Sequence, residues 1–116
     1  MAANTEALNR ACDGIASTVT QLSLHTGAPG AAGTDNELSG GSYTREAVTY
    51  AAASSGTADF TTDPEFGAGS IESTVTTVGF WAGSTYLGSA TLSANKTISG
   101  SDTLTLTSAP ITVSAA

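Results

Sequence analysis

The chain has 116 residues, a length typical of a single domain with a modest core. Apolar residues make up 40% and charged residues only 11%, so the composition is globular and the polar surface is built mainly from 20 Thr and 15 Ser residues. A net charge of -7 with only three basic residues argues against nucleic-acid binding, which needs clustered cations, and against binding to anionic membranes.

The first predicted element is a helix over residues 5–16. Asn4 or Thr5 is a suitable N-cap, and Glu6 lies at the positive end of the helix dipole. A narrow apolar stripe, suited to docking on a sheet or on a second copy of the chain, follows the i, i+3, i+4, i+7 spacing and consists of Leu8, Ala11, Cys12 and Ile15. The opening residues lack the basic and apolar regions of a signal peptide, so we expect folding in the cytoplasm of the producing cell.

Short strands and turns are predicted for the rest of the chain. The expected strands cover residues 18–26, 46–53, 57–61, 71–83, 84–92, 96–99, 102–108 and 111–115, and "AGS", "SANK", "SGSD" and "SAP" are the turn signals between the later ones. Imperfect alternation in "VGFW" predicts a bulge at Gly79. We predict one domain, 1–116: a helical segment (1–17) and a compact antiparallel β-sandwich or barrel-like sandwich (18–116) of about seven to eight strands.

A long loop rich in Gly, Ala, Ser and Thr, "LHTGAPGAAGTDNELSGGSYTRE", separates two of these strands. Catalysis would place His25, the only histidine, with Ser23 or Ser42 and Asp35. No G-x-S-x-G turn is present, however, and a strand-end histidine commonly satisfies a loop carbonyl with its ring nitrogen. We therefore predict that the protein is not an enzyme.

Metal and cofactor sites are also not predicted. Cys12 is the only cysteine, so an internal disulfide and a Cys/His zinc cluster are excluded. The acidic clusters "TDNEL" and "DPE" do not have EF-hand spacing, and turns in which Asp and Asn bond their own backbone explain "TDN" equally well. Asp59 and Glu72 form a carboxylate pair for glycoside hydrolysis only in the sense that any ten carboxylates contain such pairs.

Contact with a neighbouring protein is the third explanation of the loop. Tyr43 and Arg45 belong to the residue types enriched at interface centres, although Tyr43 also suits the end of a sandwich and Arg45 a pair with Glu37 or Glu46. Adjacent aromatic residues on one strand point to opposite faces, which leaves one of the pair in "GFW" for a partner. The interface candidates are Leu8, Cys12, Ile15, His25, Asn36, Glu37, Tyr43, Arg45 and Trp81.

The pattern L-H-T-x-x-P-G-x-x-G-x-x-N-E-x-S-G-G-S-Y-x-R, followed by V-G-x-W and a closing "GSDTLTLTSAPITVS", resembles a family of small bacteriophage structural proteins. Members are labelled tail-fibre or minor tail proteins, in phages of actinobacteria among others. The resemblance covers roughly residues 22–113. The matching residues are Leu24, His25, Thr26, Pro29, Gly30, Gly33, Asn36, Glu37, Ser39, Gly40, Gly41, Ser42, Tyr43, Arg45, Val78, Gly79 and Trp81.

The resemblance implies a non-enzymatic virion protein that is made in the host bacterial cytoplasm and leaves by lysis. Its partner would be the major capsid protein or a tail protein of the same phage. One expectation is a capsid decoration protein, a homotrimer that clamps neighbouring capsomers. A threefold position would bring its N-terminal helices or its Gly-rich loops together about the axis. The alternative is a small tail-fibre or minor tail protein near the host-binding end. Because the chain has neither heptads nor repeats, capsid decoration is favoured slightly.

A remote alternative is a calcium- or carbohydrate-binding β-sandwich. It would use Trp81 or Tyr86 as a stacking platform for a sugar, and Asp35, Glu37 or Asp63 as calcium ligands.

Overall fold

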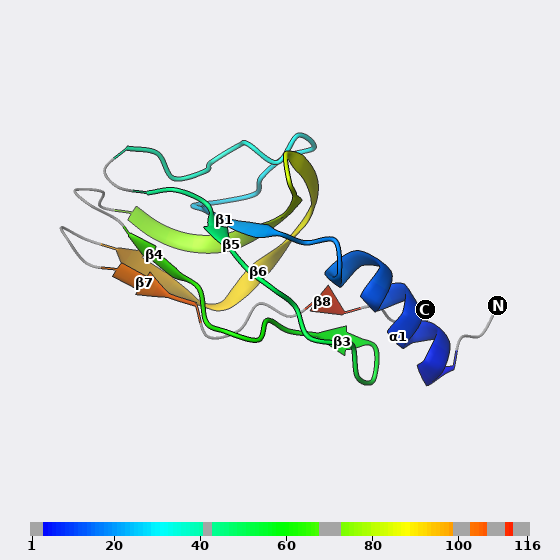
Figure 1. The fold of residues 1–116 in the computed structure, drawn as a ribbon. Helices are drawn as coiled ribbons and strands as arrows, with labels where there is room; N and C mark the ends of the chain where they lie inside the picture. The colour runs from blue at the N-terminus through cyan, green and yellow to red at the C-terminus, as the bar shows by residue number, and fades with distance from the viewer. Residues whose placement is uncertain (1–3, 41–42, 68–72, 99–102, 107–110, 113–116) are drawn as a thin grey trace.

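The computed structural model describes residues 4–40, 43–67, 73–98, 103–106 and 111–112 and is mainly β (Figure 1). Helix α1 (Thr5–Ala16) comes first. The eight strands in the described ranges are β1 (Gln21–His25), β2 (Glu46–Ala47), β3 (Thr57–Ala58), β4 (Glu65–Gly67), β5 (Ser73–Ala82), β6 (Thr85–Ile98), β7 (Thr103–Thr105) and β8 (Ile111–Thr112). All their pairings are antiparallel, so the predicted fold class, a mainly β protein behind a short N-terminal helix, is confirmed.

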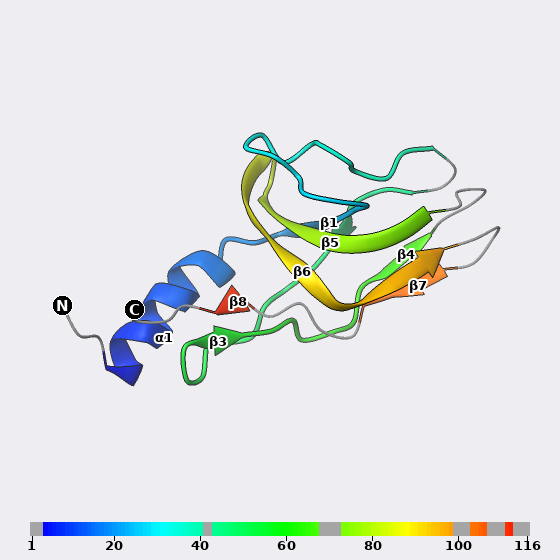
Figure 2. The same cartoon turned by 180° about the vertical axis from the view of Figure 1, so that it is seen from behind.

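The four-stranded sheet has the order β2-β1-β5-β6, and the pairs β3–β8 and β4–β7 form two smaller ladders. In both views the loop after β1 lies on one side of this sheet and β3, β4 and β7 lie on the other (Figures 1 and 2). Alternate residues of β1 and β5 point toward those smaller ladders and form the centre of the apolar core. The largest buried core side chains include Leu22, Leu24, Phe66, Val75, Val78 and Phe80.

Helix α1 has the predicted bounds, because the local signals that define it are also present in the structure. The side chain of Asn4 caps the helix by accepting a hydrogen bond from the Ala7 N–H at 2.9 Å. The predicted apolar stripe is divided, however. Cys12 is fully buried and its thiol donates to the Ile111 carbonyl at 3.2 Å, whereas Ile15 is 43% exposed.

Two polar side chains on the buried side complete the docking of α1. Asn9 Oδ1 accepts from the Gly56 N–H and Asp13 Oδ1 accepts from the Ala53 N–H, each at 2.7 Å. With the helix docked in this way, Ile15 of its apolar stripe remains in solvent.

The "SANK" turn prediction is wrong, because β6 continues through it as one strand of 14 residues. The register explains why the signal looked like a turn. Val75 pairs with Lys96 and Thr77 with Thr91, so residues 92–95 of β6 stand opposite Thr76 alone. The turn-forming residues therefore produce a wide irregularity in the ladder instead of a chain reversal.

The predicted bulge at Gly79 is also misplaced. Gly79 pairs regularly with Ser23 and Ser89, and the register shifts after Phe80 instead. A Cβ at Gly79 would lie 2.4 Å from Ser23 Oγ, so glycine is present there to make room for a neighbouring side chain.

The strand predicted over 46–53 is confined to β2 because this segment changes partner. The Val48 N–H donates to Thr20 O at 3.0 Å, but the Ala51 N–H donates to Asp59 O at 2.9 Å. Strand β4 was missed because proline and acidic residues surround it, yet Phe66 pairs with Leu104 and is fully buried. Parts of four expected strands, residues 71–72, 99, 102, 107–108 and 113–115, lie outside the described ranges.

Candidate functional site

The described residues of the segment between β1 and β2, 26–40 and 43–45, lie across one face of the sheet and are called the covering loop here (Figure 1). The later part of the loop, around residues 36–38, pairs with the end of β1. The Thr26 N–H donates to Asn36 O at 2.9 Å, and the Leu38 N–H donates to Leu24 O at 3.0 Å. The loop is therefore ordered and anchored on β1.

Close turns and one close contact shape the covering loop. Asn36 has a positive φ of 59°, and its side-chain amide donates to the Ala28 carbonyl at 3.0 Å. Gly33 has a φ of 79° and lies against the Tyr86 ring, so an added Cβ would be 2.2 Å from the ring carbon Cγ. Tyr86 in turn packs on Trp81 with ring centroids 5.3 Å apart. The loop thus rests on aromatic side chains of the β5–β6 hairpin.

A buried chain of hydrogen bonds lies beneath the covering loop. Trp81 Nε1 donates to Ser23 Oγ at 2.8 Å, Ser23 Oγ lies 2.7 Å from His25 Nε2, and His25 Nδ1 lies 2.8 Å from the Asp35 carbonyl oxygen. The carbonyl can only accept and the indole can only donate. His25 Nδ1 therefore donates to the Asp35 carbonyl, and Ser23 Oγ, which accepts from the indole, lies in position to donate its hydroxyl proton to Nε2.

This arrangement agrees with the interpretation of His25 as a histidine that satisfies a loop carbonyl. It does not form the serine–histidine–aspartate arrangement considered above, because Asp35 contributes its backbone carbonyl and not its carboxylate. Ser23 and His25 are also fully buried, out of reach of a substrate. The other candidate nucleophile, Ser42, lies outside the described residues.

A second network holds the far end of the covering loop. Arg45 donates from Nε and Nη2 to the two carboxylate oxygens of Glu37, each at 2.9 Å, so the predicted pair is confirmed. The Tyr43 hydroxyl donates to Glu37 Oε2 at 2.8 Å and accepts from the Leu24 N–H at 3.0 Å. The Arg45 guanidinium lies 3.7 Å from the centroid of the Trp81 ring, within cation–π range. The two networks therefore meet at Trp81.

Burial and charge act in opposite directions on this network. Burial by itself would raise the pKa of Glu37, but hydrogen bonds from Arg45 and Tyr43 and the charge of Arg45 together hold that pKa below its usual value. Burial raises the pKa of Tyr43 well above its ordinary value, so its hydroxyl stays protonated and able to donate. The network is consequently formed at neutral pH with Glu37 ionised.

The predicted interface candidates occupy three kinds of environment. Cys12, His25 and Trp81 are buried inside the chain, and Leu8, Glu37, Tyr43 and Arg45 are partly buried. Ile15 and Asn36 are exposed. The "GFW" expectation that one aromatic faces outward differs from what is observed: Phe80 and Trp81 do point to opposite faces, but the covering loop buries Trp81 to 4% exposure.

The described residues of the covering loop that face solvent include no cation. They are Thr26, Ala28, Gly30, Ala31, Ala32, Thr34, Asp35, Asn36, Ser39, Gly40 and Thr44. Two residues that support the covering loop, Ser23 and Tyr86, were not predicted in that role. Ser23 was considered only as a nucleophile and Tyr86 only as a sugar platform. For Ser23 the available signal was the alternation of polar and apolar residues along β1, directly before a glycine-rich loop.

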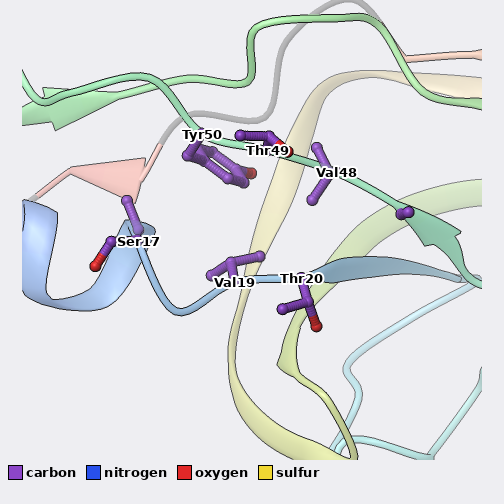
Figure 3. A pocket seen from close by; sticks show the side chains of 8 residues that line it. Ser17, Val19, Thr20, Val48, Thr49 and Tyr50 are labelled. Atoms are coloured by element: carbon purple, nitrogen blue, oxygen red, sulfur yellow. The ribbon is translucent and has the colours of Figure 1, made fainter.

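A hollow of about 390 Å³ lies between the α1–β1 connection and residues 47–50 (Figure 3). Val19, Val48 and Tyr50 form its apolar walls, and Ser17, Thr20 and Thr49 contribute hydroxyls. None of the lining residues is charged.

The described part of the chain also contains no group of three His, Cys, Asp or Glu side chains that could hold a metal ion. Within the same ranges, no helix has the length and hydropathy needed to span a membrane. Glu72, one of the two carboxylates considered for glycoside hydrolysis, lies outside the described residues.

Comparison with known proteins gave one result. The family model described as Podophage GP4 fiber I protein gp80 matches residues 2–114, almost the whole chain. Neither the curated proteins nor the solved structures contain a match to the chain.

Proposed function

The chain belongs to the family described as Podophage GP4 fiber I protein gp80, a family of phage virion structural proteins, and from this premise we propose that it is a non-enzymatic component of a phage tail fibre. The match over residues 2–114 is the observation that carries the proposal, because it includes the helix, all the described strands and the covering loop.

The covering loop supports a role in protein contact. Its inner side is fixed by Glu37, Arg45, His25 and Trp81, while its outer side presents small polar residues and backbone groups. A loop that is already ordered loses little conformational entropy when a partner binds. We therefore assign the outer side of the covering loop to contact with a neighbouring virion protein, which is a tail protein in this proposal.

Capsid decoration is the second candidate, and one observation favours it. A fibre shaft usually requires heptads or repeats, but the only helix in the described ranges has 12 residues, and the strands form a compact sandwich-like body. Such a body suits a module attached to a shell as well as one attached to a fibre. In that case the partner would be the major capsid protein.

Localisation of the protein on purified virions tests both candidates. The particles would be labelled with antibody against the chain and then reconstructed by electron cryomicroscopy. Label and density on the tail or its fibres would support the proposed function. Density at symmetry-related positions over the head would replace it with capsid decoration, and absence from the particle would overturn both.

A further inference from the structure

An apolar groove of about 350 Å³ lies between α1 and β6, and its lining includes Ile15, Phe80, Leu87, Ala90 and Ile111. It is called the α1/β6 groove here. Ile15 and Leu87, which are 43% and 42% exposed, are the exposed large hydrophobic residues of the described chain. Both of them line this one groove. Two such side chains gathered in one place indicate a contact surface more strongly than scattered ones do.

The backbone places Leu87 in the groove through a bulge. Phe80 pairs with Gly88 and Trp81 pairs with Tyr86, so Leu87 is an extra residue with no partner across the ladder. Bulges commonly re-aim a side chain. Here Tyr86 packs beneath the covering loop, while Leu87 lines the same groove as Phe80 and Ile15.

Strand β6 also ends the four-stranded sheet, with β5 as its only neighbour in that sheet. Among the described residues, no backbone hydrogen bond joins β6 to anything other than β5. This edge runs along 14 residues, is interrupted by the bulge at Leu87 and the irregularity at residues 92–95, contains no proline and carries a single charge, that of Lys96. Natural sheets usually protect an edge of this kind or use it for pairing with another chain.

The charge distribution indicates which chain meets this surface. All ten acidic residues lie outside residues 73–98, so β5 and β6 contribute no carboxylate to it. Two copies of a chain with a net charge of -7 repel one another over most approaches. Contact along β6 removes the apolar groove from water without setting carboxylates of that strand against each other.

We propose that the α1/β6 groove and the adjoining edge of β6 form the surface through which copies of this chain associate with one another. Ile15 and Leu87 of one copy pack against the same region of the next, and the edge of β6 supplies backbone donors and acceptors. This surface is separate from the outer side of the covering loop. It goes beyond the proposed function, since self-association does not depend on whether the assembly is attached to a fibre or a shell.

The test is the mass of the full-length chain in solution, measured by size-exclusion chromatography with light scattering over a range of concentrations. Because the same region of each copy meets that of the other, the contact is two-fold, and the wild type should have a mass of two chains of 11.4 kDa. Leu87→Asp should weaken association at least tenfold. Ile15→Asp, on the exposed side of α1, should do the same and provides a second variant if Leu87→Asp fails to fold.

Ala31→Asp is the matched control, because it adds the same charge at an exposed position of the covering loop. It should leave the mass unchanged. A monomeric wild type at all concentrations would overturn the proposal, and so would loss of association in Ala31→Asp but not in folded Leu87→Asp. Circular dichroism establishes that each variant is folded. A monomer in solution would leave the proposed virion role to be decided by the localisation experiment.

Discussion

Replacing Glu37 with alanine tests whether the covering loop is held by its polar network. Glu37 accepts two hydrogen bonds from Arg45 and one from Tyr43, and its side chain is only 16% exposed. A hydrogen bond to a charged group contributes roughly 1.5–3 kcal/mol. Because Arg45 is 26% exposed and can regain water, we expect Glu37→Ala to cost about 2–3 kcal/mol in total.

The assay is reversible thermal and urea unfolding followed by circular dichroism. At this chain length 1 kcal/mol corresponds to roughly 4 °C, so the Tm of Glu37→Ala should fall by about 10 °C. The chain provides its own control in the second Glu–Arg pair, Glu6 with Arg10, which has the same 2.9 Å contact but side chains that are 68% and 79% exposed. Glu6→Ala should cost less than about 0.5 kcal/mol.

The comparison of these two pairs decides the matter. Equal losses for Glu37→Ala and Glu6→Ala would show that the network under the loop contributes no more than a surface ion pair, and the reasoning would be refuted. A double-mutant cycle between Glu37 and Arg45 adds a direct measure, since a coupling energy near zero would contradict the observed bidentate geometry.

Three further predictions follow from the same region. The pKa of Glu37 is lower in the folded state than in the unfolded state, so the stability that the Glu37 carboxylate contributes is complete above the unfolded pKa of about 4.3 and is lost as pH falls through the folded pKa. The difference in unfolding free energy between wild type and Glu37→Gln, measured by urea titration, should therefore shrink below about pH 4. A difference that stays constant with pH would contradict this prediction. Gly33→Ala should lower the unfolding free energy by at least about 2 kcal/mol, because Gly33 has a positive φ and an added Cβ would overlap the Tyr86 ring. Adding Tyr86→Ala to the same chain should recover part of that loss in thermal unfolding. If nothing is recovered, the ring is not the cause. Ser23→Ala removes the acceptor of the buried Trp81 indole and should lower the unfolding free energy by about 1–3 kcal/mol. Urea unfolding followed by the fluorescence of this single tryptophan measures the change. An unchanged midpoint would count against the hydrogen bond.

Features that depend on neighbouring residues were predictable from the sequence. Helix α1 has the predicted bounds because its cap and its apolar spacing lie within 12 residues. The antiparallel β class followed from repeated short runs with turn signals between them. The prediction of a turn at "SANK" was wrong because the same residues suit both a chain reversal and a wide irregularity in a ladder. Only the pairing of Val75 with Lys96 distinguishes the two.

The purpose of the polar face of β1 was not predictable in this way. Ser23 and His25 alternate with Leu22 and Leu24, which normally indicates a strand with one face in water. The covering loop encloses that face instead, and the hydrogen bond beneath it from Trp81 to Ser23 joins residues that are 58 positions apart in the sequence. Glu37, eight positions away, was one of the two partners expected for Arg45, but the place of the pair over Trp81 depends on the sheet.

The division of the covering loop into an inner and an outer side determines how its role in contact must be tested. Variants of Glu37, Ser23 or Gly33 disturb the inner side, so they would weaken partner binding by loosening the loop even if no partner touched it. Ala31→Asp changes only an exposed position, and it should leave the Tm unchanged. If Ala31→Asp lowers incorporation into virions while its Tm and its mass in solution stay those of the wild type, the outer side of the loop is a contact with another virion protein. If incorporation is unaffected, while Leu87→Asp abolishes it, assembly depends on association between copies of the chain and the loop serves only to cover the sheet.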